Sequence, residues 1–293
     1  MNVLLQQIAN AAVLAAAYLA VTVGLFLIFN VLHIPNFAHG EMYALGAYFQ
    51  YTLVVLLGLP FFPSVVLSMA LVAVTGYLVE RFVFRRLVGF GLLSVLMGSL
   101  ALATVLQEVI RLTWGGTPIS VPLPLPAVVE LGNVRIGMYR LLVMGVVLVA
   151  CALTGWIVYY SGFGRKLRAL AQNRDLSEYA GVNVTGVGAL TFMLGSALTG
   201  LAGALSSAAG SLEPHMGFYP TLVAFVILTI VGAGGRLPMV VAGGIAIAII
   251  ETLTAGYISN AMRTAVVFAM LVAFLVWRPD GAYRGAAVER ARL

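Results

Sequence analysis

Long apolar runs, each about as long as a membrane is thick, alternate with short polar segments along this chain. A helix needs about 20 residues to cross roughly 30 Å of hydrocarbon. The pattern therefore predicts an all-α polytopic membrane protein of about 8–9 transmembrane helices, in one domain over residues 1–293. The predicted spans are 8–32, 38–58, 60–80, 91–113, 139–161, 186–209, 218–235, 237–257 and 260–277.

Two of these spans are irregular. Residues 38–58 open with Glu41, and residues 218–235 are short and end in glycines. In the alternative interpretation one of them is a re-entrant or broken helix, which gives eight crossings and one re-entrant segment. Irregular backbone at that depth persists only where protein or a water-filled cavity surrounds it. The sequence leaves both interpretations open.

Composition excludes a soluble domain, because 62% of the residues are hydrophobic and only 9% are charged. The net charge of +6 does not indicate nucleic acid, since the basic residues follow the span ends and suit contact with membrane lipids. The positive-inside rule predicts an outside N-terminus and an inside C-terminus. The inside set is Arg81, Arg85, Arg86, Arg165, Lys166, Arg168, Arg174, Arg236, Arg278, Arg284, Arg290 and Arg292; the outside set is Arg111, Arg135, Arg140 and Arg263.

Residues 114–137 form the longest outside segment, and prolines recur through its first half. Proline removes backbone donors and favours extended chain. Leu131 to Ile136 adds a short hairpin. We predict a lid or contact loop on the outer face, with a plain connector as the alternative.

Small residues gather in the span 186–209 and in the turn after 218–235. Small side chains allow helices to approach closely in lipid, where the hydrophobic effect does not drive helices together. Close packing and one sharp turn is one interpretation, and a hinge for alternating access is the other. The residues are Gly195, Gly200, Gly203 and Gly210 in the first group and Gly232, Gly234, Gly235 and Pro238 in the second.

A faint internal repeat links residues 34–80 with residues 213–251. Each copy has a Pro-containing turn, an apolar span, a Gly-x-Pro or Gly-x-x-Pro turn, and a span that reaches a glutamate. The predicted topology starts the first copy inside and the second outside. This pattern indicates a weak inverted repeat of the kind that transporters contain.

The densest polar cluster among the spans surrounds Pro35. Asn36 is placed to cap the next helix, and Glu41 lies in its first turns, where the macrodipole favours an anion. His33 and His39 flank the proline turn rather than share a helical face, so we predict no metal site. Asn36, His39 and Glu41 are candidates for the translocation path or for gating.

Four glutamates lie within or at the edges of spans, where ionisable groups are costly and mark functional sites. Glu80 adjoins Arg81, and Glu108 precedes Arg111 by three residues, so both are predicted to form end-of-span pairs. Glu251 lies deeper. We predict that it pairs across helices or lines the path.

The sequence supplies no catalytic constellation. Both aspartates lie in polar segments, and neither a GxSxG nor a GxxxxGK[ST] motif occurs. Cys151 is the single cysteine and suits a packed side chain. We therefore predict no enzyme activity, catalytic residue, metal or cofactor, and any ATP must bind to a separate subunit.

Residues 162–185 form a basic segment that reads as two short helices. Leu167, Leu170 and Ala171 share one face of the first, whose apolar side is predicted to dock in a groove of a partner protein. A merely amphipathic interfacial segment is the alternative. Asp175 to Glu178 is predicted as a capping box that opens the second helix, and Gly181 as its C′ residue.

Four blocks of the chain resemble the LivH-type permeases of branched-chain amino-acid ABC importers. They occur in the expected order, although Arg236 and Pro238 depart from the glycine-rich turn of many relatives. The blocks are NFAHGEMYALGAYF (36–49), GRKLRALAQNRDLSEYAGVNV (164–184), EPHMGFYPTLVAFVILTIVGAGGRLPMVVAGG (213–244) and FLVWRPDGAYR (274–284).

The resemblance implies a multi-pass permease of the bacterial inner membrane. Implied partners are a second, LivM-like permease, two cytosolic ATPase subunits and a periplasmic substrate-binding protein that meets residues 114–137 and 210–217. Related permeases carry urea, amides or small carboxylates, which are alternative substrates. An ion-coupled carrier that uses Glu41 or Glu251 is the alternative to an ATP-driven importer. The implied ATPase-coupling residues are Arg165, Lys166, Arg168, Asn173, Asp175, Glu178 and Gly181; the implied path or gating residues are Asn36, His39, Glu41, Gly232, Gly234, Gly235 and Glu251.

Overall fold

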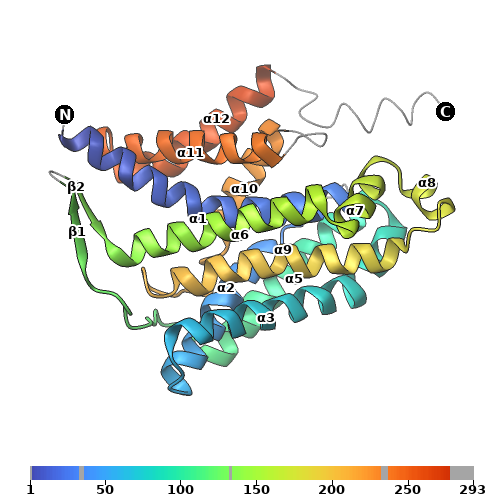
Figure 1. The fold of residues 1–293 in the computed structure, drawn as a ribbon, viewed down its shortest axis with the longest axis horizontal. Helices are drawn as coiled ribbons and strands as arrows, with labels where there is room; N and C mark the ends of the chain where they lie inside the picture. The colour runs from blue at the N-terminus through green and yellow to red at the C-terminus, as the bar shows by residue number, and fades with distance from the viewer. Residues whose placement is uncertain (1, 33–35, 132–133, 232–236, 278–293) are drawn as a thin grey trace.

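The computed structural model describes residues 2–32, 36–131, 134–231 and 237–277. They form an α-helical bundle with one small β-hairpin at its end (Figure 1). Short π-helical and 3₁₀ turns extend α2, α3 and α4 and precede α12. The elements are α1 (Asn2–Leu32), α2 (His39–Tyr51), α3 (Phe61–Val79), α4 (Arg85–Leu87), α5 (Leu92–Trp114), β1 (Val128–Leu131), β2 (Val134–Gly137), α6 (Met138–Tyr160), α7 (Gly162–Gln172), α8 (Arg174–Tyr179), α9 (Val184–Ser206), α10 (Phe218–Val231), α11 (Leu237–Tyr257) and α12 (Arg263–Trp277).

The prediction of a polytopic helical protein is confirmed. Within the described residues, seven helices are long and apolar enough to cross a membrane. The helix in the predicted span 218–235 is shorter, and residues 38–58 are not among the seven. The seven candidate spans are Leu4–Val31, Phe61–Phe90, Leu92–Trp114, Met138–Tyr160, Val184–Ser206, Leu237–Tyr257 and Asn260–Trp277.

The bundle has two distinct ends, which we call the hairpin end, after β1–β2, and the elbow end, after α7–α8 (Figure 1). At the hairpin end, the ring of Phe61 in the first turn of α3 lies 5.8 Å from that of Tyr139 at the start of α6. At the elbow end, Leu237 at the start of α11 lies beside Gly155 near the end of α6. Long helices therefore run in both directions, as consecutive membrane crossings require.

Helices α1 and α9 form the centre and are mostly buried. They cross at Gly24 and Gly195, where a Cβ atom on either residue would lie about 2.5 Å from the other's carbonyl oxygen. Gly200 and Gly203 bring α9 equally close to α3 and α2. The predicted close packing is therefore confirmed for three of the four glycines. Gly210 lies beyond the helix in open space.

Helices α2 and α10 begin in contact with each other inside the bundle. The backbones of Gly40 and Gly217 touch, so neither position has room for a side chain. From this contact α2 runs toward the hairpin end, where Thr52 accepts a hydrogen bond from Trp114. Helix α10 runs toward the elbow end. The second predicted span is therefore a helix that starts in contact with α10 inside the bundle and continues through the π-helical turn Thr52–Leu56.

Helix packing follows the predicted internal repeat. Helix α3 packs on α9 as α11 packs on α1, and α2 packs on α5 as α10 packs on α12. The central α1–α9 crossing and the α2–α10 contact are shared by both halves. Helices that begin inside a bundle and meet at their N-terminal ends are a recurrent device at transporter binding sites.

The hairpin predicted near Leu131 to Ile136 is confirmed and begins slightly earlier, at Val128. The strands are antiparallel, with Glu130 opposite Arg135. The side chain of Gln6 in α1 fixes the hairpin by exchanging two hydrogen bonds with the backbone of Arg135, at 3.0 and 2.8 Å. The preceding proline-rich segment pairs at Ile119 with Leu212, so residues 114–137 and 210–217 meet on one surface.

Candidate coupling elbow and polar cavity

The first helix of the elbow, α7, is fixed rigidly to the end of α6. The Ser161 hydroxyl caps α7 by accepting a hydrogen bond from the Gly164 amide at 2.9 Å. Gly164 packs directly on the carbonyl groups of Ile157 and Val158, where no larger residue fits. Arg168 donates to the Val158 carbonyl, which is one of the unpaired acceptors at the helix end. Arg168 is therefore an anchor within this chain.

The apolar face of α7 points inward. Leu167 and Leu170 are buried in a small cluster with Val31 and Val187, from the end of α1 and the start of α9. This corrects the prediction that the face formed by Leu167, Leu170 and Ala171 docks in a partner. Its apolar area is already covered by the bundle, so α7 moves with α1, α6 and α9.

The second helix, α8, is capped by Asn173, not by Asp175. The Asn173 side chain accepts from the Leu176 amide at 2.9 Å, which corrects the predicted capping box. Asp175 instead lies in the first turn of α8. Gly181 ends the helix as predicted: its φ is +79°, and the amides of Gly181 and Val182 bond to Glu178 and Ser177.

The elbow exposes charge together with two large apolar side chains. Leu176 is 65% exposed and Tyr179 is 88% exposed, three residues apart on α8. Neither side chain was predicted as a contact residue from the sequence, although their spacing on a helix of six residues was a usable signal. The exposed charged residues predicted for this segment are Arg165, Lys166, Arg174, Asp175 and Glu178.

The polar turn before α2 is packed inside the bundle. Asn36 accepts from the Ala38 amide at 3.0 Å, but the N-cap of α2 is Ala38 itself, so the predicted capping role is wrong. His39 is fully buried, with Nε2 lying 2.7 Å from the Thr199 hydroxyl and 3.2 Å from the Val21 carbonyl. His33 lies outside the described residues. His39 therefore joins α2 to the central crossing of α1 and α9, whereas the hydrogen bond of the Asn36 side chain lies within its own turn.

Glu41 is buried in α2 and has one side-chain partner among the described residues. Gln107 of α5 donates to Oε1 at 2.8 Å, whereas Oε2 has no hydrogen-bond partner in this part of the chain. The side-chain amide oxygen of Gln107 (Oε1) in turn lies 3.2 Å from Nδ1 of His215, which comes just before α10. This arrangement joins α2, α5 and the entry to α10.

Glu251 forms the predicted pair across helices. The carboxylate is 0% exposed on α11 and accepts from Arg263, at the start of α12. Tyr18 of α1 donates to the same carboxylate at 2.8 Å. Arg263, which was predicted to lie in the outside set of basic residues, thus extends its side chain into the bundle. A buried ionisable group in a membrane segment marks a functional site by default, together with its partner.

Two other predicted pairs lie at helix ends. Glu108 and Arg111 pair within α5 as predicted. Glu80 pairs with Arg85 at 2.6 Å and not with Arg81. The π-helical turn at Glu80–Phe84 explains this correction, because a wider turn aligns residues five apart.

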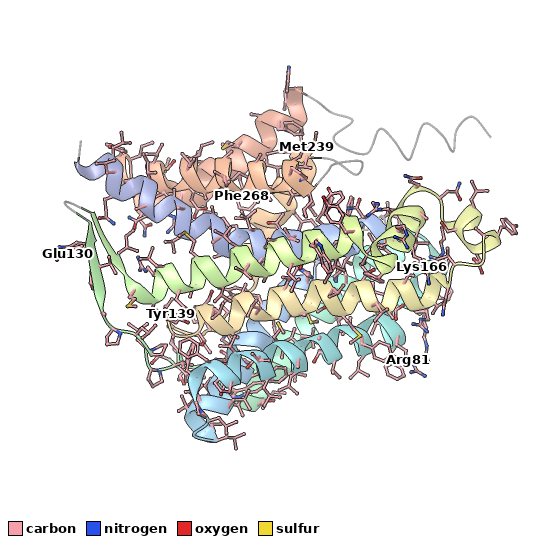
Figure 2. All side chains as sticks on the ribbon, viewed as in Figure 1. Arg81, Glu130, Tyr139, Lys166, Met239 and Phe268 are labelled. Carbon is pink, nitrogen blue, oxygen red and sulfur yellow. The ribbon has the colours of Figure 1, made fainter. Side chains whose placement is uncertain are left out.

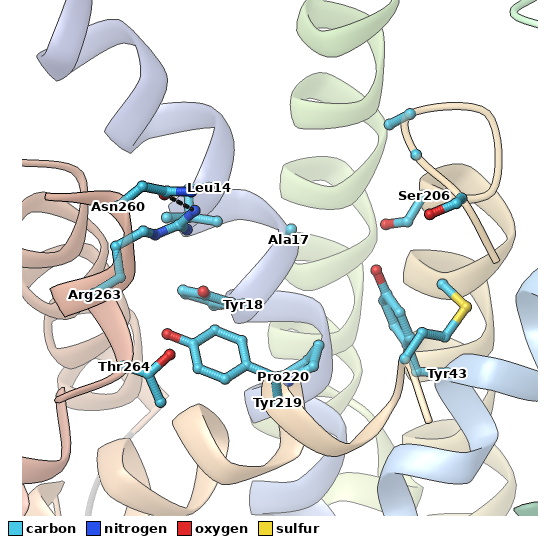
Figure 3. A pocket seen from close by; sticks show the side chains of 14 residues that line it. Leu14, Ala17, Tyr18, Tyr43, Ser206, Tyr219, Pro220, Asn260, Arg263 and Thr264 are labelled. Atoms are coloured by element: carbon cyan, nitrogen blue, oxygen red, sulfur yellow. Dashed lines mark hydrogen bonds between the residues drawn. The ribbon is translucent and has the colours of Figure 1, made fainter. Parts of the chain in front are cut away.

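A cavity of about 520 Å³ opens beside the Glu251–Arg263 pair, between α1, α2, α9, α10 and α12 (Figure 3). Three tyrosines from three helices point toward it, together with Arg263. A second cavity of about 350 Å³ adjoins it toward α6. Gly232, Gly234 and Gly235 lie outside the described residues. The first cavity is lined by Leu14, Ala17, Tyr18, Tyr43, Ser206, Ala209, Gly210, Ser211, Met216, Tyr219, Pro220, Asn260, Arg263 and Thr264.

Comparison with known proteins identifies close counterparts over nearly the whole chain. The permease protein BraD of the high-affinity branched-chain amino acid transport system of Pseudomonas aeruginosa is 27% identical, over 98% of this chain and 97% of its own. The corresponding protein LivH of Escherichia coli K12 is 26% identical over the same shares. A probable LivH of Methanocaldococcus jannaschii is 25% identical, over 86% of this chain and 82% of its own.

No solved structure matches the chain. Residues 7–275 match the family described as the permease component of branched-chain amino acid transport systems. The match covers the helices from α1 to α12, including the elbow and the cavity. This chain therefore belongs to the family of branched-chain amino acid ABC transport system permeases, and it is a transport subunit rather than an enzyme.

Proposed function

We propose that this chain forms part of the translocation path of an ATP-driven importer for branched-chain or related amino acids. Its family and its relatives' names support the substrate class. The sequence has no GxxxxGK[ST] motif, so ATP hydrolysis takes place on separate subunits. A second, LivM-like permease, two cytosolic ATPase subunits and a periplasmic binding protein complete the importer.

The elbow α7–α8 is the observation that carries the proposal. Its outer helix presents Leu176 and Tyr179 to a partner, and its inner helix is fixed to the bundle by Leu167, Leu170 and Arg168. A force applied to α8 therefore acts directly on α1, α6 and α9. Exposed aromatic and apolar side chains ringed by charge are typical of a protein interface. This surface is the proposed docking site of an ATPase subunit.

Charge supports an orientation with the elbow in the cytoplasm. Figure 2 shows Arg81 and Lys166 at the elbow end and Glu130 at the hairpin end. Cytoplasmic loops of membrane proteins carry the excess of Lys and Arg. The N-terminus then faces the periplasm of a bacterial inner membrane, and the C-terminus faces the cytoplasm.

The hairpin end is the proposed contact surface for the binding protein. Backbone pairing between Ile119 and Leu212 joins the proline-rich loop to the entry of α10. A protein that pushes on this loop therefore acts on the segment that leads to Gly217 and the cavity. The contact offers a direct route from substrate delivery to the interior of the bundle.

Reconstitution tests the function. The chain is purified with the subunits that accompany it and placed in liposomes with the binding protein and L-leucine. We expect uptake that requires ATP inside the vesicles, and no uptake by the chain alone. Accumulation of L-leucine by the chain alone, driven by a proton or sodium gradient, would contradict the proposal.

A labelling experiment tests the orientation. Arg174→Cys in a Cys151→Ala chain puts one exposed thiol on α8, and Gly116→Cys puts one at the hairpin end. In intact spheroplasts, a membrane-impermeant thiol reagent is expected to modify the second thiol only. Modification of the α8 thiol instead would reverse the topology.

A further inference from the structure

The cavity of Figure 3 has the size and composition of a binding site for a small solute. Its volume of about 520 Å³ falls within the range of roughly 300–1,000 Å³ found for ligand pockets. The adjoining cavity shares Leu14, Ala17, Ser206 and Ala209 with it, and also Arg263. Arg263 therefore stands where the two cavities meet.

Arg263 retains hydrogen-bonding capacity toward the cavity. A guanidinium group has five N–H donors. Nε and Nη2 each use one on Glu251, and Nη1 uses one on Asn260 at 3.3 Å. Two N–H groups thus have no acceptor among the described residues. The Arg263 side chain is 32% exposed, whereas that of Glu251 is 0% exposed. The guanidinium group, and not the carboxylate, is presented to the cavity.

The positive charge of Arg263 stands at a place where it lowers the stability of the fold, which a purely structural role does not explain. It is the first residue of α12, where the helix dipole disfavours a cation. It also belongs to a segment apolar enough to cross a membrane. Glu251 offsets the charge, and one N–H group on each of Nη1 and Nη2 of this cavity-lining side chain has no acceptor among the described residues. A carboxylate suits a guanidinium group with donors to spare, because its oxygens accept charge-assisted N–H bonds.

The rest of the wall suits an ammonium group and an aliphatic chain. The rings of Tyr18, Tyr43 and Tyr219 face the cavity, and aromatic faces attract cations within about 6 Å. The Tyr219 hydroxyl lies beside Thr264 in the wall of the cavity. Leu14 and Met216 add apolar surface.

We propose that this cavity binds a zwitterionic amino acid with an aliphatic side chain, with its α-carboxylate on the two free N–H groups of Arg263. The ammonium group lies among the tyrosines, and the side chain lies against Leu14 and Met216. Glu251 and Asn260 orient the guanidinium group. The proposal rests on the proposed transport function, and it assigns a specific substrate site to this subunit.

Protection of a single thiol from modification tests the site. Ser206 lines both cavities, so Ser206→Cys is introduced into a full-length Cys151→Ala chain in lipid nanodiscs. The rate of modification by a small thiosulfonate reagent is measured with L-leucine and with L-leucinol, which lacks the carboxylate. At about ten times Kd, L-leucine is expected to slow modification about tenfold. L-Leucinol is expected to have no effect.

Two controls separate binding from structural effects. Gly116→Cys, exposed at the hairpin end, should be modified at the same rate with and without L-leucine. Arg263→Lys keeps the charge but loses the planar fork, and it should weaken protection at Ser206→Cys about tenfold or more. Equal protection by L-leucinol, or full protection in the Arg263→Lys chain, would exclude the carboxylate assignment.

The experiments distinguish a wrong assignment of the cavity from a wrong proposal for the transport function. If the reconstituted importer takes up L-leucine but L-leucine does not protect Ser206→Cys, the cavity is not the site and the proposed function stands. A Ser206→Cys thiol that does not react at all would also overturn the assignment, because the cavity would then be closed. An importer that does not transport L-leucine refutes the proposed function first.

Discussion

Gly40 and Gly217 bring the starts of α2 and α10 into backbone contact, with the carbonyl oxygen of each lying where a side chain on the other would lie. Thr221 in the first turn of α10 closes the same contact. The packing of α2 against α10 therefore depends on the absence of side chains at both positions. The polar turn before α2 and the cavity beside α10 keep their relative positions through this contact.

Alanine at Gly40 or Gly217 is expected to destabilise the fold. An added methyl group must displace backbone, and overpacking of this kind costs about 1–3 kcal/mol or more. Gly145→Ala in α6 is the matched control, because nothing lies within 4 Å of its Cβ position and alanine favours a helix by about 1 kcal/mol. The melting temperature of the protein in detergent should fall for the first two variants and hold or rise for the control.

The pair Glu251–Arg263 predicts an asymmetric double-mutant cycle. Arg263→Gln leaves a fully buried carboxylate without its cation and is expected to cost about 3 kcal/mol, whereas Glu251→Gln leaves a partly exposed guanidinium and should cost less. The double variant Glu251→Gln/Arg263→Gln should recover most of the lost stability. Thermal unfolding of the four proteins measures the cycle. Equal losses for the two single variants, with a simple sum for the double variant, would show that the charges do not interact.

Removing the charge of Glu41 is expected to preserve or raise stability, in contrast to breaking the Glu251–Arg263 pair. Its carboxylate is buried, and no cation pairs with it among the described residues. Glu41→Gln keeps an acceptor for Gln107 and removes the cost of a buried charge, so its melting temperature should equal or exceed that of the parent chain. Gln107→Leu removes the donor and should lower it. A large loss of stability in Glu41→Gln would reveal a cationic partner for Glu41.

Sequence patterns predicted the long helices well, because the length of an apolar run fixes a membrane helix almost independently of its neighbours. For residues 38–58 the same reasoning left a crossing and a re-entrant or broken helix both open. Their composition suits a span, but the buried turn at Asn36 and the contact at Gly40 are tertiary features. Hydropathy therefore located the helix to within a residue of its start at His39 but could not show that this start packs against α10 inside the bundle.

The candidate sites were only partly predictable for a related reason. Glu251 was singled out because it is charged within an apolar run, but its partner Arg263 is 12 residues away on the next helix. No helical spacing links them. Likewise, an amphipathic pattern located the apolar face of α7 correctly, yet Leu167 faces its own bundle. A pattern shows that a face is buried and leaves open which surface covers it.

The cap of α8 predicts a local loss of stability at the elbow. Asn173→Ala removes the acceptor for the Leu176 amide, and a lost N-cap costs about 1 kcal/mol. Asp175→Ala, in the first turn of the same helix, should cost less because it removes only an interaction with the helix dipole. Hydrogen exchange followed by mass spectrometry should show faster exchange across α8 in the first variant. Faster exchange in Asp175→Ala alone would restore Asp175 as the cap.

Truncation of the exposed pair on α8 should separate coupling from folding. Leu176→Ala/Tyr179→Ala removes side chains that are 65% and 88% exposed, so the melting temperature should stay unchanged. If an ATPase subunit docks on this surface, loss of two central contacts should lower ATP-driven uptake of L-leucine about tenfold or more.

Leu190→Ala is the matched control, because it removes an apolar side chain that is 49% exposed on α9 and belongs to neither helix of the elbow. Uptake by that variant should match the parent chain. Uptake that survives the double truncation would move the docking surface off α8. A parallel loss in Leu190→Ala would mean that the effect comes from lost apolar surface in general. Only a defect confined to α8, in a protein of normal stability, supports force transfer through the elbow.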